Sequence, residues 1–231
     1  MYQKYWKRPL DFCAAAGALI VLSPLLLILT LIGAIAMGGN PFFTQLRPGK
    51  KGLDGQERIF RLIKFRSMSN RKGPDGKLLP DAQRLNRYGK LLRASSLDEL
   101  PELFNILKGD MSLVGPRPQL VRDMVFMTRE QRRRHDVRPG LTGLAQVNGR
   151  NCIAWEDKFR YDLQYIDRGI TLWGDIRILL QTVGKVLKHT DTVREGTVSD
   201  MDLGDWLLEK EAVTPEEYEE KQAEAKGLLG V

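Results

Sequence analysis

One short stretch decides how the rest of this chain is interpreted: Ser95-Ser96-Leu97-Asp98-Glu99-Leu100-Pro101-Glu102-Leu103-Phe104. Its leucines fall at helical spacing, which predicts an amphipathic helix with one apolar face. Ser96 and Glu99 have the spacing of a capping box, and a proline at position 101 is tolerated only in the first turn of a helix. We therefore predict that this helix begins between Ser96 and Leu100.

Asp98 and Glu99 would then lie at the positive end of the helix, where backbone N–H groups lack partners. That position favours ionised carboxylates, and an ionised carboxylate can serve as a nucleophile or as a metal ligand. The same two residues could instead do no more than cap the helix. The stretch alone does not decide between these interpretations.

The composition describes a basic body with an acidic end. The chain has 231 residues and a net charge of +7. From Glu195 onward, eleven acidic and three basic residues give −8, which leaves +15 for residues 1–194. This imbalance suggests an anionic partner, such as phosphates, nucleic acid or lipid headgroups. The two cysteines, Cys13 and Cys152, imply no disulfide framework, so we expect a reducing compartment.

Residues 12–37 form an apolar run of 26 residues without a charged side chain. A straight helix of this length would be about 39 Å long, enough to cross an apolar layer about 30 Å thick. Three interpretations compete: a signal peptide, a simple transmembrane span and a re-entrant hairpin. The run is longer than the apolar core of a signal peptide, which disfavours the first.

Two features suit the hairpin. Ser23 and Pro24 lie in the middle of the run, and a proline there kinks a helix. Basic residues flank both ends of the run, so the positive-inside tendency gives no preferred direction of crossing. From the residues alone, the hairpin and the span remain about equally supported.

The remaining pattern predicts short strands and amphipathic helices. We expect strands at residues 42–45 and 59–66, loops at 47–56 and 70–81, and helices at 82–93 and 176–188. The helix at 82–93 is basic on one face, and it could lie on an anionic membrane surface or be an ordinary solvated helix. Thr214 and Pro215 predict the start of a helix in the acidic tail.

Arg117 lies between Pro116 and Pro118. The two rings restrict the backbone on both sides, so the guanidinium loses little entropy when it binds a ligand. Such an arginine suits a phosphate that must be held in one orientation. A rigid surface turn is the alternative.

Four blocks of sequence then occur in order: Lys64–Met68, Ser96–Pro101, Gly109–Pro118 and Val137–Arg150. Over roughly residues 1 to 190, the chain resembles the small monotopic phosphoglycosyl transferases of the bacterial sugar transferase family. The resemblance implies an α+β, mainly helical, monotopic membrane protein. Such a protein has an N-terminal re-entrant helix-break-helix, amphipathic interfacial helices and a small β element. The resemblance also favours the hairpin over the span. It divides the chain into a membrane hairpin at residues 1–40, a cytoplasmic catalytic domain at 41–190 and an acidic tail at 191–231.

The resemblance further implies a reaction. Such enzymes transfer a sugar-1-phosphate from a UDP-sugar to polyprenyl (undecaprenyl) phosphate and release UMP, in a ping-pong mechanism through an aspartyl-phosphosugar. This is the first membrane step of glycoconjugate assembly, and it takes place at the cytoplasmic face of the bacterial inner membrane. Asp98 matches the nucleophile, and Glu99 matches the partner carboxylate that holds Mg²⁺ together with Asp98. Lys64 and Arg117 match basic positions that contact phosphates.

Other positions follow from the same resemblance. Five residues of the fourth block are expected at the nucleotide-sugar site: Arg138, Gly140, Thr142, Asn148 and Arg150. Asp162 and Asp175 match acidic positions of the family, where catalysis and a structural salt bridge remain alternatives. We interpret His135, in a basic patch, as part of a solvated face, and the aromatic residues at 155–165 as core or membrane-interface residues.

A protein without catalysis is the rival hypothesis: a membrane-tethered basic module that binds lipid or nucleic acid. The chain lacks the known nucleic-acid-binding signatures, and its basic residues do not form one stripe, so we expect no nucleic-acid partner. A homodimer remains open. The sequence does not specify the sugar or the glycan pathway.

Overall fold

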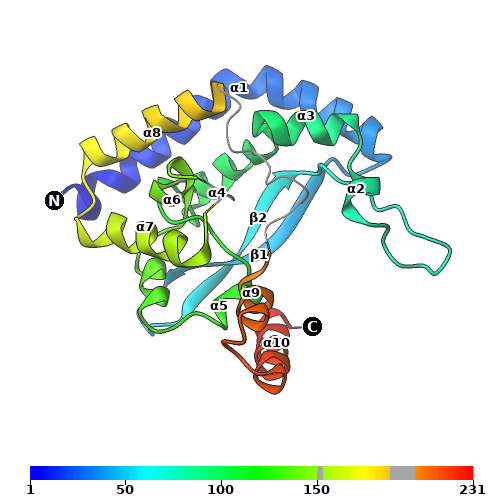
Figure 1. The fold of residues 1–231 in the computed structure, drawn as a ribbon. Helices are drawn as coiled ribbons and strands as arrows, with labels where there is room; N and C mark the ends of the chain where they lie inside the picture. Colours follow the sequence, from blue (N-terminus) through cyan, green and yellow to red (C-terminus); the bar gives the residue numbers. More distant parts are fainter. Residues whose placement is uncertain (150–152, 188–200, 231) are drawn as a thin grey trace.

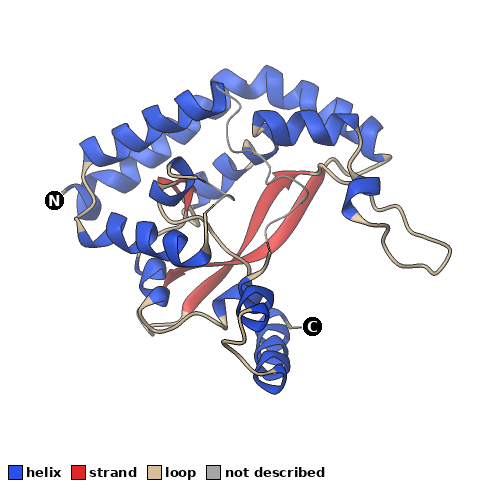
Figure 2. Ribbon diagram, in the orientation of Figure 1, coloured by secondary structure: helices blue, strands red, loops and turns tan. Residues whose placement is uncertain are grey.

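The computed structural model describes residues 1–149, 153–187 and 201–230. Within these ranges the chain is mainly helical and contains two small sheets, in agreement with the expected α+β class (Figure 2). Long helices gather along one side of the molecule, and a β-hairpin runs from that side towards the opposite end (Figure 1).

The N-terminal apolar run forms one long helix. A π-helical turn at Tyr2–Trp6 leads into α1 (Lys7–Met37), which continues through Pro24. The Ser23 hydroxyl donates a hydrogen bond to the Ile20 carbonyl at 2.8 Å. α1 bends near its middle (Figure 1), but it is continuous through Ser23 and Pro24, where the sequence predicts a break between two helices.

The β-hairpin is longer than the sequence indicated. Strand β1 (Phe42–Lys51) pairs with β2 (Glu57–Phe65) in antiparallel register. The prediction of a loop at 47–56 was wrong for residues 47–51, which continue β1. A register irregularity between Pro48 and Lys51 accommodates the proline, which cannot donate a ladder hydrogen bond.

The helix expected at 82–93 is divided into α2 (Asp81–Arg84) and α3 (Arg87–Ser95). Asn86 causes the new start, because its side-chain oxygen accepts a hydrogen bond from the Gly89 N–H at 2.8 Å and so caps α3. The preceding loop, expected at 70–81, protrudes from the body (Figure 1).

The central part of the chain consists of short elements. Strand β3 (Ser112–Val114) pairs in parallel with β4 (Gly140–Thr142), and Ser112 lies opposite Gly140. The other elements are, in chain order, a 3₁₀ turn η2 (Leu97–Glu99), α4 (Glu102–Lys108), α5 (Val121–Met124), a 3₁₀ turn η3 (Gln131–Asp136), α6 (Leu144–Val147), α7 (Trp155–Asp167) and α8 (Leu172–Leu187).

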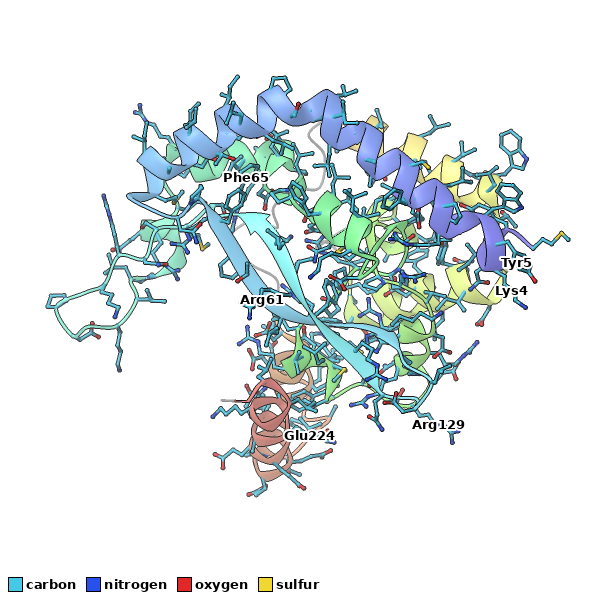
Figure 3. The ribbon with its side chains drawn as sticks, turned by 180° about the vertical axis from the view of Figure 1, so that it is seen from behind. Lys4, Tyr5, Arg61, Phe65, Arg129 and Glu224 are labelled. Carbon is cyan, nitrogen blue, oxygen red and sulfur yellow. The ribbon has the colours of Figure 1, made fainter. Side chains whose placement is uncertain are left out.

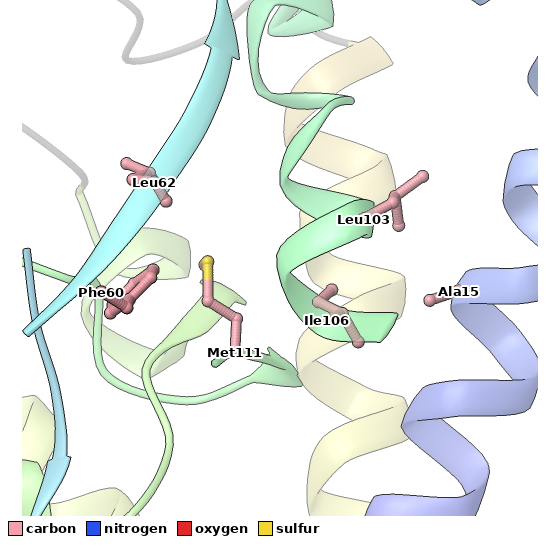
Figure 4. Packing of buried hydrophobic residues seen from close by; sticks show 6 residues of the cluster. All are labelled: Ala15, Phe60, Leu62, Leu103, Ile106 and Met111. Carbon is pink, nitrogen blue, oxygen red and sulfur yellow. The ribbon is translucent and has the colours of Figure 1, made fainter. Parts of the chain in front are cut away.

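A hydrophobic cluster joins α1, α4 and β2. Ala15, fully buried, faces α4 and leaves room for close packing of the two helices (Figure 4). The buried residues of this cluster are Ala15, Phe60, Leu62, Leu103, Ile106 and Met111. Through this packing the segment that carries Asp98 and Glu99 lies directly against the apolar N-terminal helix.

Both ends of α1 are also fastened to the folded body. Near its first residues, the Lys7 ammonium pairs with Asp175 at 2.6 Å, and Asp11 accepts a hydrogen bond from the Ser112 hydroxyl at 2.6 Å. Near its last turn, the Asn86 side chain donates to the Ala36 carbonyl at 3.0 Å. The body therefore contacts α1 along its whole length.

The outer face of α1 is apolar and exposed. Within the described ranges, the helix formed by the π-helical turn and α1 (Tyr2–Met37) is the one that is long and apolar enough to cross a membrane. α8 lies along the same side of the molecule (Figures 1 and 3). The most exposed large apolar residues of the two helices define what we call the apolar face: Ile20, Val21, Leu27, Leu31, Ile35, Trp173, Leu180 and Val183. A patch of this extent normally marks contact with a membrane or a partner.

The acidic tail folds onto the body at the end far from α1. It forms α9 (Leu203–Glu209) and α10 (Pro215–Leu229), and Thr214 caps α10 as expected, accepting from the Glu217 N–H at 3.1 Å. Ala225 of α10 is buried against the apolar side chains of α5. The described part of the tail is thus packed on the body.

Candidate active site

Asp98 and Glu99 lie on the 3₁₀ turn η2, one turn before α4 begins at Glu102. The expected helix start is therefore correct for the 3₁₀ turn but too early for the α-helix. The expected capping box is wrong: Ser96 has a left-handed backbone (φ 56°), and the Glu99 carboxylate turns to other partners. This geometry presents two neighbouring carboxylates on a turn instead of along one helix.

Two cations hold the Glu99 carboxylate. Its Oε1 accepts from the Lys64 ammonium at 3.0 Å and from Arg117 Nη2 at 2.7 Å. Burial alone would raise the pKa of Glu99, but Arg117 and Lys64 outweigh burial and hold it well below its usual range. Glu99 is consequently an anion at every physiological pH, and the structure brings together Lys64, Glu99 and Arg117 as expected.

Glu102 is a third carboxylate of this cluster, and sequence reasoning missed it. It is 2% exposed, and its Oε1 lies 3.0 Å from the Lys64 ammonium. Burial, together with the neighbouring Glu99 anion, raises its pKa to about 7, against the opposing effect of Lys64. The available signal was spacing, because residues 98 and 102 are four apart and can share one face of a helix.

Asp98 differs from its neighbours because, among the residues that the structure describes, its side chain accepts no hydrogen bond and forms no ion pair. Burial and the adjacent Glu99 anion raise its pKa to about 6, against the opposing effect of Lys64 and Arg117. At neutral pH the Asp98 carboxylate is therefore mostly ionised, and no described side chain is hydrogen-bonded to it or paired with it. A carboxylate in this state can attack an electrophile or bind a metal ion.

Asn105 sets the distance between β2 and α4, a role that the sequence did not reveal. Its side-chain oxygen accepts from the Ile63 N–H at 3.1 Å, and its amide nitrogen donates to the Arg61 carbonyl at 2.8 Å. The amide thus substitutes for a neighbouring strand at the free edge of β2. Since Lys64 follows Ile63 directly, this contact places the ammonium beside the carboxylates of η2 and α4.

The backbone on both sides of Arg117 is held by hydrogen bonds. The Gly115 N–H donates to the Thr142 carbonyl and the Gly140 N–H to the Pro116 carbonyl, each at 2.9 Å. Only glycine fits at 115 and 140, because a Cβ on either would overlap the backbone of the other segment. Pairing with β4 thus adds to the backbone restriction that the two prolines impose on Arg117.

The residues expected at the nucleotide-sugar site have contacts of their own. Arg138 Nε donates to the Gly109 carbonyl at 2.8 Å, the Thr142 hydroxyl lies 2.7 Å from that of Thr182, and the Asn148 side chain donates to the Leu144 carbonyl at 2.8 Å. Gly140 belongs to β4, as described above, and Arg150 lies outside the described residues. The role of these five residues in binding a nucleotide sugar stays a prediction.

The two acidic residues left open by the sequence form buried contacts. Asp162 pairs with Arg134 at 2.6 Å, and Asp175 pairs with Lys7 and accepts from the Tyr165 hydroxyl at 2.8 Å. Both contacts fit structural salt bridges. Trp155, Phe159 and Tyr165 are likewise buried in hydrophobic clusters, as one of the two interpretations required.

The interpretation of His135 as part of a solvated face was wrong. Its ring is 4% exposed and its Nδ1 lies 3.2 Å from a Glu57 carboxylate oxygen. Burial lowers the pKa of His135 to about 4, so the ring is neutral at physiological pH. A run of charged letters did not reveal that η3 turns two of its residues, Arg134 and His135, into the core.

Comparison with known proteins agrees with this architecture. A family model described as bacterial sugar transferase matches residues 2–189. The chain therefore belongs to the bacterial sugar transferase family.

Three relatives illustrate the similarity. An uncharacterized sugar transferase, EpsL of Bacillus subtilis, is 46% identical over 78% of this chain and 87% of its own length. The UDP-glucose:undecaprenyl-phosphate glucose-1-phosphate transferase of Caulobacter vibrioides is 40% identical, over 78% of this chain and 69% of its own length. A UDP-N-acetylgalactosamine-undecaprenyl-phosphate N-acetylgalactosaminephosphotransferase of Aeromonas hydrophila is 37% identical over 78% of this chain, but the match covers only 43% of that protein. With relatives of this kind, the chain is a phosphoglycosyl transferase, an enzyme associated with a membrane.

Proposed function

We propose that this enzyme transfers a sugar-1-phosphate from a UDP-sugar to polyprenyl phosphate, undecaprenyl phosphate in bacteria, and releases UMP. The observation that carries the proposal is the difference between two adjacent carboxylates. Glu99 is held as an anion by Lys64 and Arg117, whereas Asp98 has no hydrogen bond among the described residues. Asp98 is thus available as a nucleophile beside two cations that suit a phosphate.

The reaction proceeds in two displacements at one phosphorus atom. An Asp98 carboxylate oxygen bonds to the β-phosphorus, the bond from that phosphorus to the bridging oxygen breaks, and UMP leaves with the bonding electrons. An oxygen of polyprenyl phosphate then bonds to the same phosphorus, and the bond to Asp98 breaks, which restores the carboxylate. Neither nucleophile has to lose a proton first, so no histidine base is required.

Arg117 has donors to spare for the phosphates of the sugar nucleotide. A guanidinium carries five N–H donors, and the Arg117 side chain, 36% exposed, uses Nη2 to reach Glu99. Glu99 therefore serves to orient Arg117 and Lys64 towards the reacting phosphorus. Leu97 and Leu100, which flank the acid pair, belong to the same hydrophobic cluster as Leu25 and Leu26 of α1. The acid pair therefore lies beside α1, and we place the approach of the lipid substrate on the side of this helix.

The acid cluster fits a magnesium ion. When Asp98, Glu99 and Glu102 are all ionised, they outnumber the cations Lys64 and Arg117 by one charge, and carboxylate oxygens are suitable ligands for Mg²⁺. No three potential ligand side chains converge into a complete site within the described ranges. Mg²⁺ would therefore be held by Asp98 and Glu99 together with phosphate oxygens of the substrate, and when bound it would offset the charge of the diphosphate.

The transfer assay tests this function. Purified protein is incubated with a radiolabelled UDP-sugar, Mg²⁺ and undecaprenyl phosphate, using UDP-glucose, UDP-galactose and UDP-N-acetylgalactosamine first because relatives are named for these or their sugars. We expect label in the lipid phase and an equal amount of released UMP with at least one donor. If no UDP-sugar is consumed across a full panel while the lipid is still bound, the non-catalytic lipid-binding module would be the better description.

We also propose that α1 is re-entrant and that both of its ends stay on the cytoplasmic face of the inner membrane. A span would separate its ends by the apolar thickness of about 30 Å and would place one end beyond the reach of the body. Lys7 and Asp11 at one end, and Ala36 at the other, are instead bonded to the same body. The exposed side chains of α1 and α8 are then buried in one leaflet.

Topology can be measured with single cysteines in a chain that lacks Cys13 and Cys152. Gln3→Cys and Thr44→Cys place thiols at exposed positions before and after α1. In intact spheroplasts a membrane-impermeant maleimide should label neither thiol, and in inside-out vesicles it should label both. Labelling of Gln3→Cys from the periplasmic side would show that α1 spans the membrane.

A further inference from the structure

We propose that Arg134 is a positioning residue for Arg117. Arg134 donates a hydrogen bond to the backbone carbonyl of Arg117 and forms none with the Arg117 side chain. The inference rests on the proposed function, because that function assigns Arg117 to the phosphates of the sugar donor. Arg134 is 2% exposed and belongs to η3, seventeen positions along the chain from Arg117.

The Arg134 guanidinium connects two elements. Its Nη2 donates to the Arg117 carbonyl at 2.7 Å and to the Asp162 carboxylate at 2.6 Å, and its Nε donates to the same carboxylate at 3.0 Å. The guanidinium also lies over the Phe159 ring, 5.9 Å from its centroid. Asp162 and Phe159 belong to α7, so Arg134 ties the Arg117 loop to a helix packed in the core.

A hydrogen bond at this carbonyl fixes a backbone rotation of Arg117 that the prolines leave open. The rings of Pro116 and Pro118 fix their own φ angles, and a following proline only restricts its neighbour to a broad extended region. The direction of the Arg117 carbonyl is therefore not set by the local sequence. Arg134 sets it, and Arg47 fixes the next peptide unit by donating to the Pro118 carbonyl at 3.1 Å.

Rotation of the Arg117 backbone would move its guanidinium away from Glu99. The Arg117 Nη2 to Glu99 Oε1 distance of 2.7 Å leaves little tolerance for such a shift. A displacement of about 1 Å at a reacting centre can lower a rate by about 100-fold. Arg134 is thus coupled to the reaction although its described contacts are with Arg117, Asp162 and Phe159.

A double-mutant cycle with Arg117 tests the proposal in the full-length protein. Arg134→Lys keeps the positive charge for Asp162 but lacks the planar fork that reaches both Asp162 and the Arg117 carbonyl. We expect kcat/KM for the UDP-sugar to fall about 10- to 100-fold in Arg134→Lys. In the Arg117→Ala background, the same substitution should cause no further loss, because the residue that it positions is gone. Arg133→Lys, on the same 3₁₀ turn but paired with Glu130 and Asp167 at the surface, is the matched control and should keep wild-type activity.

An equal further loss in the Arg117→Ala background would overturn the proposal, since it would show a general structural role. Should Arg134→Lys fail to fold, as judged by its circular dichroism melt, Asp162→Asn is used in the same cycle, because it weakens the hold on Arg134 with almost no change in shape. The affinity of each variant for the UDP-sugar, measured by calorimetry, gives a second double-mutant cycle that does not depend on turnover. If wild type neither binds nor consumes any UDP-sugar, the proposed function fails and this inference fails with it, whereas wild-type turnover with additive losses refutes the positioning role alone.

Discussion

Asp98→Asn should abolish sugar-phosphate transfer, lowering kcat by at least about a thousandfold, as the loss of a catalytic nucleophile does in other enzymes. The amide has the shape of the carboxylate but lacks the anionic oxygen that bonds to phosphorus. The fold should survive, because Asp98 holds no hydrogen bond among the described residues that the substitution would break. Asp54→Asn, at the tip of the hairpin, is the matched control and should leave turnover unchanged.

The intact mass of the protein identifies the same residue directly. With a UDP-sugar and Mg²⁺ but without lipid acceptor, the wild-type chain should gain the mass of one sugar phosphate, and Asp98→Asn should gain none. An adduct of that mass on Asp98→Asn, or turnover equal to wild type, would transfer the role to another residue. Glu99 is the first alternative to test, although its ion pairs with Lys64 and Arg117 hold it as the orienting partner.

The pH dependence follows from the raised pKa of Asp98. Below its pKa of about 6 the carboxyl is protonated and cannot attack, so kcat/KM should fall about tenfold per pH unit as the pH decreases through that value. A bound cation favours the ionised form, so the midpoint should move to lower pH as Mg²⁺ is increased. A profile that is flat from pH 5 to 8 at the lowest Mg²⁺ concentration that supports turnover would contradict the assignment.

The sequence identified the chemical groups of the site but not their arrangement. Asp98, Glu99, Lys64 and Arg117 are all predicted site residues, and the structure brings the last three into contact. Acidic residues at a predicted helix start and an arginine between prolines are local features that mark Asp98, Glu99 and Arg117 as candidates, whereas their roles, and Lys64 altogether, follow from the family resemblance. The pairing of Glu99 with both cations is a tertiary contact, and no local pattern specifies it.

Buried polar residues were the ones that the sequence could not place. Glu102, Asn105, Arg134 and His135 are all nearly inaccessible, yet their letters alone predict a surface. Each is buried because a partner from a distant segment satisfies it: Lys64 for Glu102, β2 for Asn105, Asp162 for Arg134 and Glu57 for His135. The capping box failed for the same reason, since Glu99 finds a stronger partner in Arg117 than in the backbone of its own turn.

The N-terminal helix shows a similar limit. In the sequence, Lys7 is one of the basic residues before the apolar run, and such residues bear on the direction of insertion. In the fold it is buried against Asp175, more than 160 positions further along the chain. A flanking charge that is neutralised inside the protein has little effect on topology. The anchoring of both helix ends to one body is therefore the better evidence for a re-entrant helix, and it requires the structure.

Lys64→Met should lower kcat/KM by about 100-fold or more, because Lys64 serves the carboxylates and the substrate phosphates together. Its ammonium lies 3.0 Å from both Glu99 and Glu102, inside the protein. Without it, the three carboxylates of the cluster retain Arg117 as their only directly paired cation among the described residues. The fraction of Asp98 that is ionised at neutral pH then falls, because Lys64 normally lowers its pKa.

The pH profile separates this electrostatic role from a loss of packing. Removing a cation near Asp98 raises the pKa of its carboxyl further, so the residual activity of Lys64→Met should reach half its maximum at a higher pH than in wild type. Lys51→Met is the matched control, since Lys51 belongs to the same hairpin but pairs with Asp136 at its far end; its midpoint should not move. A Lys64→Met profile with an unshifted midpoint, at any level of activity, would mean that the ammonium does not tune Asp98. Lys64 would then act on the substrate phosphates alone.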